Sequence, residues 1–84
     1  MKLLKVRLYG AENCHKTQYY QSLLEERMIS FEFLDVVKNE DNTVELRDLY
    51  LNGRLNFPTI LIGEKKLRNP KDEELWQWLD KLKS

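Results

Sequence analysis

The hydrophobic pattern of the first 36 residues changes from a strand period to a helix period and back again. Residues 3–9 place apolar side chains at alternate positions, which predicts a strand. Residues 13–28 place them at helical spacings, which predicts a helix with Asn13 as its N-cap. A second strand follows over residues 31–36. This order predicts a parallel pair of strands joined by a right-handed crossover.

The second predicted strand is apolar on both of its faces. Phe31 and Phe33 point to one side, whereas Leu34 and Val36 point to the other. A strand of this kind is typical of a sheet that is covered on both sides. We therefore expect helices on both faces of the sheet.

The remainder of the chain predicts a helix, a hairpin and a closing helix. Residues 42–45 have the spacing of a capping box, and Asn52-Gly53 would end the helix that starts there. Residues 59–62 and 65–68 predict two antiparallel strands joined by a tight turn at Gly63-Glu64.

The closing helix is expected to begin at Asn69-Pro70, which three acidic residues follow closely. Its apolar face is formed by four residues: Leu75, Trp78, Leu79 and Leu82. The whole pattern predicts an α/β fold of order β-α-β-α-β-β-α, with a four-stranded mixed sheet flanked by helices.

Length and charge narrow the class of protein. The 84 residues predict one domain over residues 1–84. Fourteen basic residues balance fourteen acidic ones, so the chain has no net charge that would favour nucleic acid. The sequence has no apolar run of about 20 residues for a membrane span and no signal-peptide pattern. We expect a soluble, cytoplasmic monomer that binds neither nucleic acid nor membrane.

The chain has one cysteine, Cys14, and one histidine, His15. These counts exclude an internal disulfide and a four-ligand zinc site within the chain, and we expect no metal. Cys14 is predicted at the first turn of a helix, where free N–H groups favour a thiolate. His15 and Lys16 would lower the pKa of the thiol further, whereas Glu12 would raise it. The alternative is a small buried side chain without reactivity.

Two further residues have a predicted place in the site. His15 is adjacent to Cys14 on a helix, so the two side chains diverge by about 100° and do not form a catalytic pair. We expect His15 to contribute a local charge or an exposed ring beside the substrate. Pro58 precedes the third strand, at a position where its missing N–H costs little, and its peptide bond would be trans by default.

Residues 9–17, 23–32 and 57–63 together resemble a glutaredoxin, and the order of elements is that of the thioredoxin fold. The resemblance covers essentially the whole chain. It implies that Cys14 is the nucleophile and that Pro58 is a cis-proline facing it. It also implies that the backbone of Phe57 pairs with the peptide part of glutathione.

The chain departs from the glutaredoxin pattern at several positions. Thr17 replaces the second cysteine, which leaves a monothiol Cys-x-x-Thr site in which Thr17 stabilises the thiolate. Ala11 occupies the place of the lysine that contacts glutathione, and residues 68–72 replace a Gly-Gly pair with its acidic neighbour. Because these glutathione-binding residues are missing, Arg68 is the candidate partner for a glutathione carboxylate. Met28 replaces a helix-ending glycine, so we expect this helix to end differently.

These observations support two functions. The first is a monothiol disulfide oxidoreductase that acts on mixed disulfides of glutathione or a similar small thiol. It would have no tightly bound cofactor, glutathione as co-substrate, and glutathionylated proteins as further partners. The second is a thioredoxin-fold binding or redox-sensing module without catalysis, which the loss of the second cysteine favours.

Overall fold

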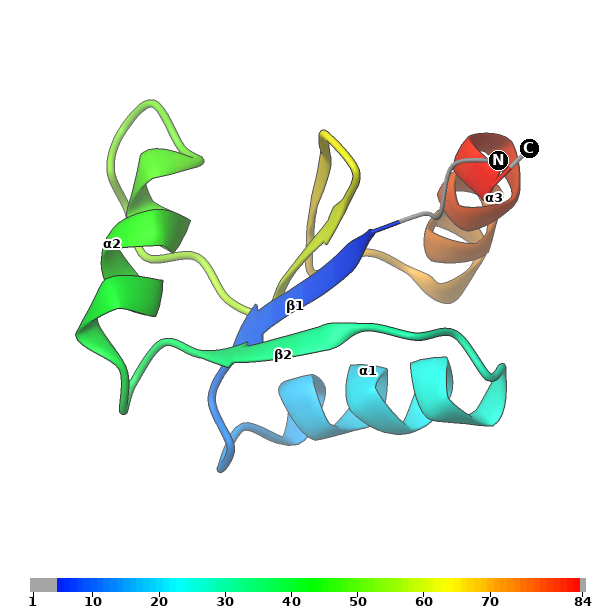
Figure 1. Ribbon diagram of the computed structural model, residues 1–84, viewed down its shortest axis with the longest axis horizontal. Helices are drawn as coiled ribbons and strands as arrows, with labels where there is room; N and C mark the ends of the chain where they lie inside the picture. Colours follow the sequence, from blue (N-terminus) through cyan, green and yellow to red (C-terminus); the bar gives the residue numbers. More distant parts are fainter. Residues whose placement is uncertain (1–4, 84) are drawn as a thin grey trace.

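The computed structural model describes residues 5–83, with side chains described as far as residue 81. The elements are β1 (Val6–Gly10), α1 (His15–Glu26), β2 (Glu32–Asp35), α2 (Glu40–Asp48), β3 (Thr59–Ile62), β4 (Lys65–Arg68) and α3 (Asp72–Lys83), as Figure 1 shows. The predicted order of elements is confirmed. Leu3 and Leu4 of the first predicted strand, and the side chain of Leu82, lie outside the described part. Within residues 5–83, none of the helices is both long and apolar enough to cross a membrane.

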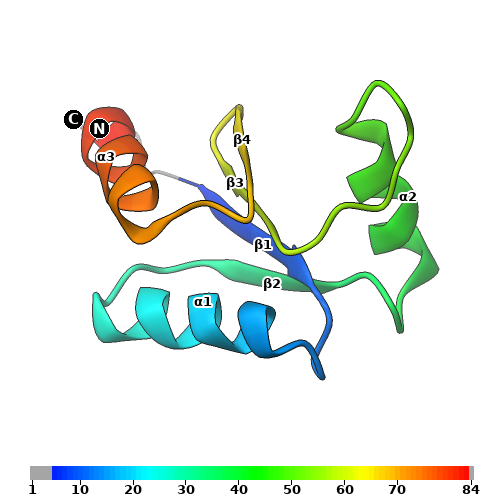
Figure 2. The same cartoon turned by 180° about the vertical axis from the view of Figure 1, so that it is seen from behind.

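The four strands form one mixed sheet in the order β2-β1-β3-β4, which Figure 2 shows from behind. β1 is parallel to β2 and antiparallel to β3, and β3 is antiparallel to β4. Tyr9 pairs with Thr59, Thr59 pairs with Arg68, and Gly10 pairs with Asp35. The end of β1, the end of β2, the start of β3 and the end of β4 therefore lie at one end of the sheet.

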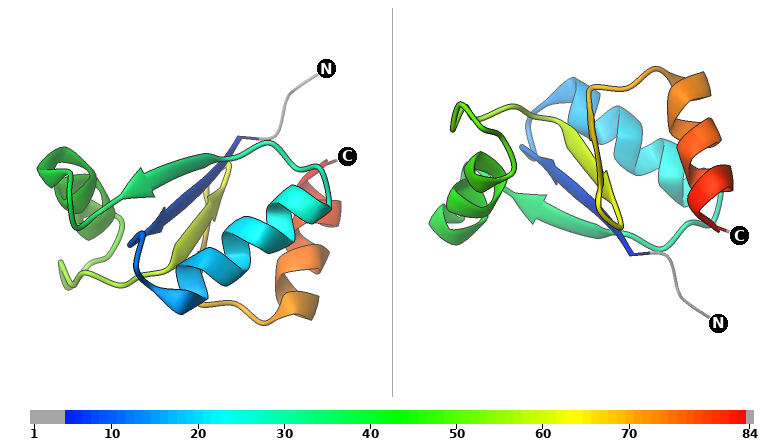
Figure 3. Two further views of the ribbon diagram at one scale, coloured as in Figure 1. Left: turned by 90° about the horizontal axis from the view of Figure 1, so that it is seen from below. Right: turned by 90° about the horizontal axis from the view of Figure 1, so that it is seen from above.

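Helices cover both faces of this sheet, with α1 and α3 on one face and α2 on the other (Figure 3). The face under α1 and α3 buries residues of five elements: Val6, Leu8, Tyr20, Leu24, Ile60, Ile62, Leu67, Leu75 and Leu79. The face under α2 buries Tyr9, Val36 and Leu46. Phe31 and Phe33 pack on the first face and Leu34 on the second, which confirms the two-sided pattern of the second predicted strand.

The predicted hairpin is confirmed, and the predicted start of α3 is wrong. Gly63 has a φ of 60°, which is the conformation expected at the first central position of the turn. α3 begins at Asp72, and the carbonyl of Lys71 accepts its first helical hydrogen bond, from Leu75 at 2.9 Å. Asn69 instead takes a φ of 47° before the helix, because it makes tertiary contacts that the local pattern does not contain.

The predicted start of α2 is also wrong. The helix begins at Glu40, with Asn39 as its N-cap, and the Asn39 side chain accepts hydrogen bonds from the N–H groups of Asp41 and Asn42. Thr43 instead donates its hydroxyl to the carbonyl of Val36, the residue that follows β2. α2 ends at Asp48, before the predicted Asn52-Gly53, and Gly53 adopts a φ of 65° in a later turn.

The end of α1 differs from the expectation that a methionine would prevent a left-handed ending. Met28 has a φ of 57°. Its N–H donates to the carbonyl of Glu25, and the N–H of Ile29 donates to the carbonyl of Leu24, both at 3.0 Å. This is the Schellman arrangement that a glycine ordinarily closes. Ile29 packs on the same core as Leu24, and this contact holds the strained residue in place.

Met28→Gly should raise the free energy of unfolding by about 1 kcal/mol, because the left-handed conformation strains every residue with a Cβ. The Met28 side chain is 92% exposed, so its removal loses little packing. Urea denaturation measures the change. Met28→Ala is the control, because alanine removes the side chain and keeps the strain. Equal stability of the two variants would contradict this prediction.

Candidate functional site

Cys14 is the N-cap of α1, and it is partly buried. Its N–H donates to the carbonyl of Ala11, and its own carbonyl accepts the first helical hydrogen bond from Gln18, both at 3.0 Å. The turn over residues 11–14 therefore places Cys14, and not Asn13, at the cap. The Asn13 prediction is wrong because this turn fixes where the helical backbone begins.

Thr17 anchors the first turn of α1 against the end of β1. Its side chain is fully buried, and its Oγ1 accepts a hydrogen bond from the N–H of Ala11 at 3.3 Å. A Cβ added to Gly10 would lie 2.4 Å from Oγ1 and 2.5 Å from Cγ2 of Thr17. The first turn of α1 therefore lies so close to the end of β1 that only a glycine fits at position 10.

The surroundings of Cys14 favour its thiolate. The Thr17 hydroxyl is the main cause that lowers the pKa of the thiol, and the N–H groups of Thr17 and Lys16 and the charge of Lys16 act in the same direction. Burial opposes them. The thiol makes no capping hydrogen bond to the first turn of the described helix, because a neutral thiol is a weak acceptor. These donors therefore act mainly on the charged form.

A second part of the site precedes β3. The Phe57-Pro58 peptide bond is cis, as the resemblance implied and against the trans default. Thr59 Oγ1 donates to the carbonyl of Asn56 at 2.7 Å, and it therefore accepts the hydrogen bond of 2.8 Å from the Tyr50 hydroxyl. Within residues 5–83, the backbone N–H and carbonyl of Phe57 have no hydrogen-bond partner. These two groups are therefore free to pair with an extended peptide.

The segment between β4 and α3 joins the two parts of the site. The N–H of Asn69 donates to the carbonyl of Pro58 at 3.0 Å. Tyr20 of α1 donates its hydroxyl to the carbonyl of Pro70 and also contacts Oδ1 of Asn69 at 3.3 Å. Burial is the main cause that raises the pKa of Tyr20 to about 12, so its hydroxyl remains a donor at neutral pH. The helix that carries Cys14 is thereby tied to the loop that carries Pro58.

The structure brings some of the predicted site residues together and leaves others apart. Thr17 contributes to the electrostatics of Cys14, and Pro58 and Arg68 border the same end of the sheet. His15 is the exposed first residue of α1, and the pKa of Cys14 responds to Thr17 and Lys16 rather than to it. Phe57 is 36% exposed, and Arg68 is exposed at the end of β4.

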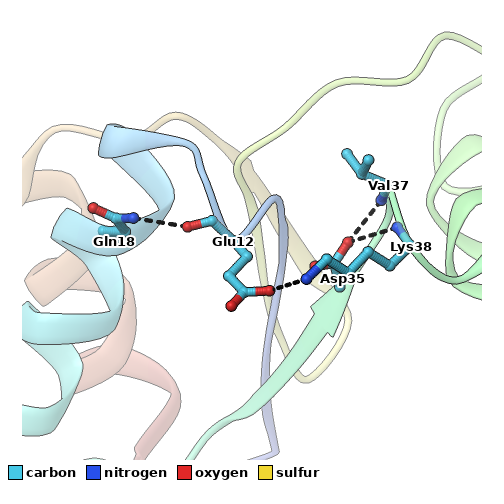
Figure 4. A network of polar contacts seen from close by, with 5 residues as sticks. All are labelled: Glu12, Gln18, Asp35, Val37 and Lys38. Atoms are coloured by element: carbon cyan, nitrogen blue, oxygen red, sulfur yellow. Dashed lines mark hydrogen bonds and ion pairs between the residues drawn. The ribbon is translucent and has the colours of Figure 1, made fainter.

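Sequence reasoning missed the polar contacts of the turn before Cys14. Glu12, expected to raise the pKa of Cys14, forms an ion pair with Lys38, as Figure 4 shows. Gln18 donates to the Glu12 carbonyl at 2.7 Å. Lys38 is 26 residues from Glu12 in sequence, so no local pattern indicates this pair.

Residues 5–83 contain no group of three or more His, Cys, Asp or Glu side chains arranged to hold a metal ion.

Gly10→Ala should lower the free energy of unfolding by about 1–3 kcal/mol, because the new methyl group overlaps the Thr17 side chain. Thr17→Ala removes the overlapping atoms. The double variant should therefore be destabilised by less than the sum of the two single variants. Urea denaturation of all four proteins measures this coupling, and additive effects would show that the contact is not tight.

Thr17→Val should raise the pKa of Cys14, because it removes the hydroxyl that is the main cause of the lowered value. The pH dependence of Cys14 alkylation measures this pKa, and for the wild-type protein we expect a midpoint below the value of about 8.5 of a free cysteine. Thr17→Ser keeps the hydroxyl and is the matched control. A wild-type midpoint at or above the free-cysteine value would contradict the prediction.

The architecture is similar to that of proteins of known structure that are described as thioredoxin-like or as a glutaredoxin. The chain superposes on the crystal structure of the thioredoxin-like protein BC3987 with a TM-score of 0.73 and 22% identity, over 86% of this chain and 96% of that one. For a mutant of the same protein, the TM-score is 0.75 and the sequence identity is 23%, over 88% of this chain and 97% of that one. For the glutaredoxin from Archaeoglobus fulgidus, the TM-score is 0.72 and the sequence identity is 19%, over 89% of this chain and 85% of that one.

Sequence comparison adds nothing to this likeness. No protein-family model matches the chain, and no curated protein matches it significantly. At identities below 25%, the solved structures establish the fold and leave the activity open. The mixed sheet, the helices on both its faces and these structural neighbours together identify the fold of this chain as thioredoxin-like.

Proposed function

We propose that this chain is a glutaredoxin-like monothiol disulfide oxidoreductase that acts on mixed disulfides of glutathione or a similar small thiol. The observation that carries the proposal is the position of Cys14, the one cysteine of the chain, at the N-cap of α1. At this position, the hydroxyl and N–H of Thr17 lower the pKa of the thiol. A thiolate is the form that attacks a disulfide.

The chemistry requires the Cys14 thiolate, the glutathione unit carried by the mixed disulfide and one free glutathione. The Cys14 thiolate attacks the glutathione sulfur of a mixed disulfide R–S–S–G, so a Cys14–glutathione disulfide forms and R–S⁻ leaves and takes a proton from water. The thiolate of a second glutathione attacks the glutathione sulfur of this intermediate. Glutathione disulfide forms, and the Cys14 thiolate is regenerated. In the net reaction, the R–S group of the substrate is reduced to a thiol, and one free glutathione is oxidised to glutathione disulfide with the glutathionyl unit taken from the substrate.

The remaining groups would hold the substrate. The N–H and carbonyl of Phe57, which have no hydrogen-bond partner within residues 5–83, would suit the peptide backbone of glutathione or of a glutathionylated protein, and cis-Pro58 follows them directly. Arg68 would provide a partner for a carboxylate, and His15 a local charge on the exposed side of α1. We propose that the protein acts as a cytoplasmic monomer without a tightly bound cofactor.

A second candidate function is binding or redox sensing on the same fold without turnover. It is favoured by the contacts of the segment that follows β4. The hydroxyl of Tyr19 donates to the carboxylate of Asp72 at 2.5 Å, and the N–H of Asn69 donates to Pro58. The segment that replaces the Gly-Gly pair and its acidic neighbour is therefore already engaged in contacts within the protein.

The test of catalysis is turnover of a glutathionylated peptide by the purified protein in the presence of glutathione. Glutathione disulfide production is followed with a glutathione reductase couple. The wild-type protein should exceed the uncatalysed rate, and Cys14→Ser should return to it, because an alcohol does not form the mixed disulfide. If the wild-type protein and Cys14→Ser are equally inactive, the oxidoreductase proposal fails and the second candidate replaces it.

A further inference from the structure

An ion pair connects the turn before α1 with the loop after β2. Nζ of Lys38 contacts Oε2 of Glu12, and Figure 4 shows the Glu12 side chain extended toward Lys38 at the end of β2. Glu12 lies two residues before Cys14, and Lys38 lies three residues after the end of β2. The pair therefore links the segment that leads into Cys14 to the neighbouring parallel strand.

Both loops are held by hydrogen bonds that do not depend on the ion pair. Gln18 of α1 donates to the main-chain carbonyl of Glu12 at 2.7 Å. Oδ1 of Asp35 accepts from the N–H groups of Val37 and Lys38, both at 2.8 Å. The side chains of the pair thus start from fixed backbones, and this arrangement lowers the entropic cost of keeping them together.

Glu12 is the acidic residue nearest in sequence to Cys14. Its carboxylate would oppose a negative charge on the sulfur if no cation compensated it. Two cations belong to this region, Lys16 on α1 and Lys38 on the loop after β2. Lys16 lowers the pKa of Cys14, whereas Lys38 pairs with Glu12 and lowers the pKa of Asp35.

We infer that Lys38 is a positioning residue of the Cys14 site, because its pairing with Glu12 turns and neutralises the one carboxylate that precedes the nucleophile. The inference rests on the proposed function in that the Cys14 thiolate is the attacking group. Lys38 itself takes no part in the disulfide exchange. By neutralising Glu12, Lys38 removes a negative charge that would oppose the stabilisation of the Cys14 thiolate by the cations and N–H groups of α1.

The scale of the effect follows from exposure. The side chains of Lys38 and Glu12 are 66% and 62% exposed, so water and salt screen the pair. Because an exposed pair of this kind interacts weakly, its effect on the pH midpoint of Cys14 should be at most about half a pH unit. High salt should reduce the shift.

The test is a double-mutant cycle of Lys38→Met and Glu12→Gln, with the pH midpoint of Cys14 alkylation as its readout. Lys38→Met alone should raise the midpoint by up to about half a pH unit, because it leaves Glu12 uncompensated. In the Glu12→Gln background, Lys38→Met should shift it by less than half as much. Lys38→Arg keeps the charge and should keep the wild-type midpoint. Circular dichroism of each variant establishes that the fold is unchanged.

Two outcomes overturn the inference. A midpoint that Lys38→Met leaves unchanged shows that the ion pair has no influence on Cys14. An equal shift in both backgrounds shows that Lys38 acts directly on the sulfur and not through Glu12. Alkylation requires no turnover, so a wild-type protein that fails the glutathione assay refutes the proposed function and leaves this cycle interpretable.

Discussion

The close contact between Gly10 and Thr17 fixes the geometry on which the rest of the site depends. Because Gly10 has no Cβ, the first turn of α1 lies directly against the end of the central strand, and the Thr17 side chain is fully buried there. The Ala11 N–H closes this contact by donating to Thr17. Cys14 then lies at the N-cap of α1, where the hydroxyl of Thr17 and the N–H groups of Thr17 and Lys16 favour the charged form of its thiol.

The thiol is surrounded by a network that joins elements distant in sequence. Tyr20 and Asn69 connect the Cys14 helix to the loop of Pro58, and Lys38 connects the Glu12 turn to β2. Each link uses a polar group at the end of the sheet where β1, β2 and β3 meet. The position of Cys14 therefore depends on contacts across the whole end of the sheet, and not on its own segment alone.

Much of the fold could be predicted from the sequence, because the strands carry strong local signals. The two-sided pattern of residues 31–36 predicted helices on both faces of the sheet, and Gly63 predicted the hairpin turn. The helix ends were less predictable. Asn42 and Asn69 have the chemistry of N-caps, yet Asn39 caps α2, and Asn69 contacts Tyr20 instead. Several Asn and Thr residues could cap each helix, and long-range contacts select among them.

The sequence by itself determined the order of the elements, the pairing of apolar faces and the restriction to chemistry with one thiol, since these follow from residue type and periodicity. Tertiary structure alone decided which groups surround that thiol. Met28 takes a left-handed conformation because the packing of Ile29 compensates its strain, and Lys38 neutralises Glu12 because parallel pairing brings β2 beside β1. Local sequence patterns reflect the conformational preferences of individual residues. The charge near Cys14 depends on residues that are distant in sequence and that only folding brings together.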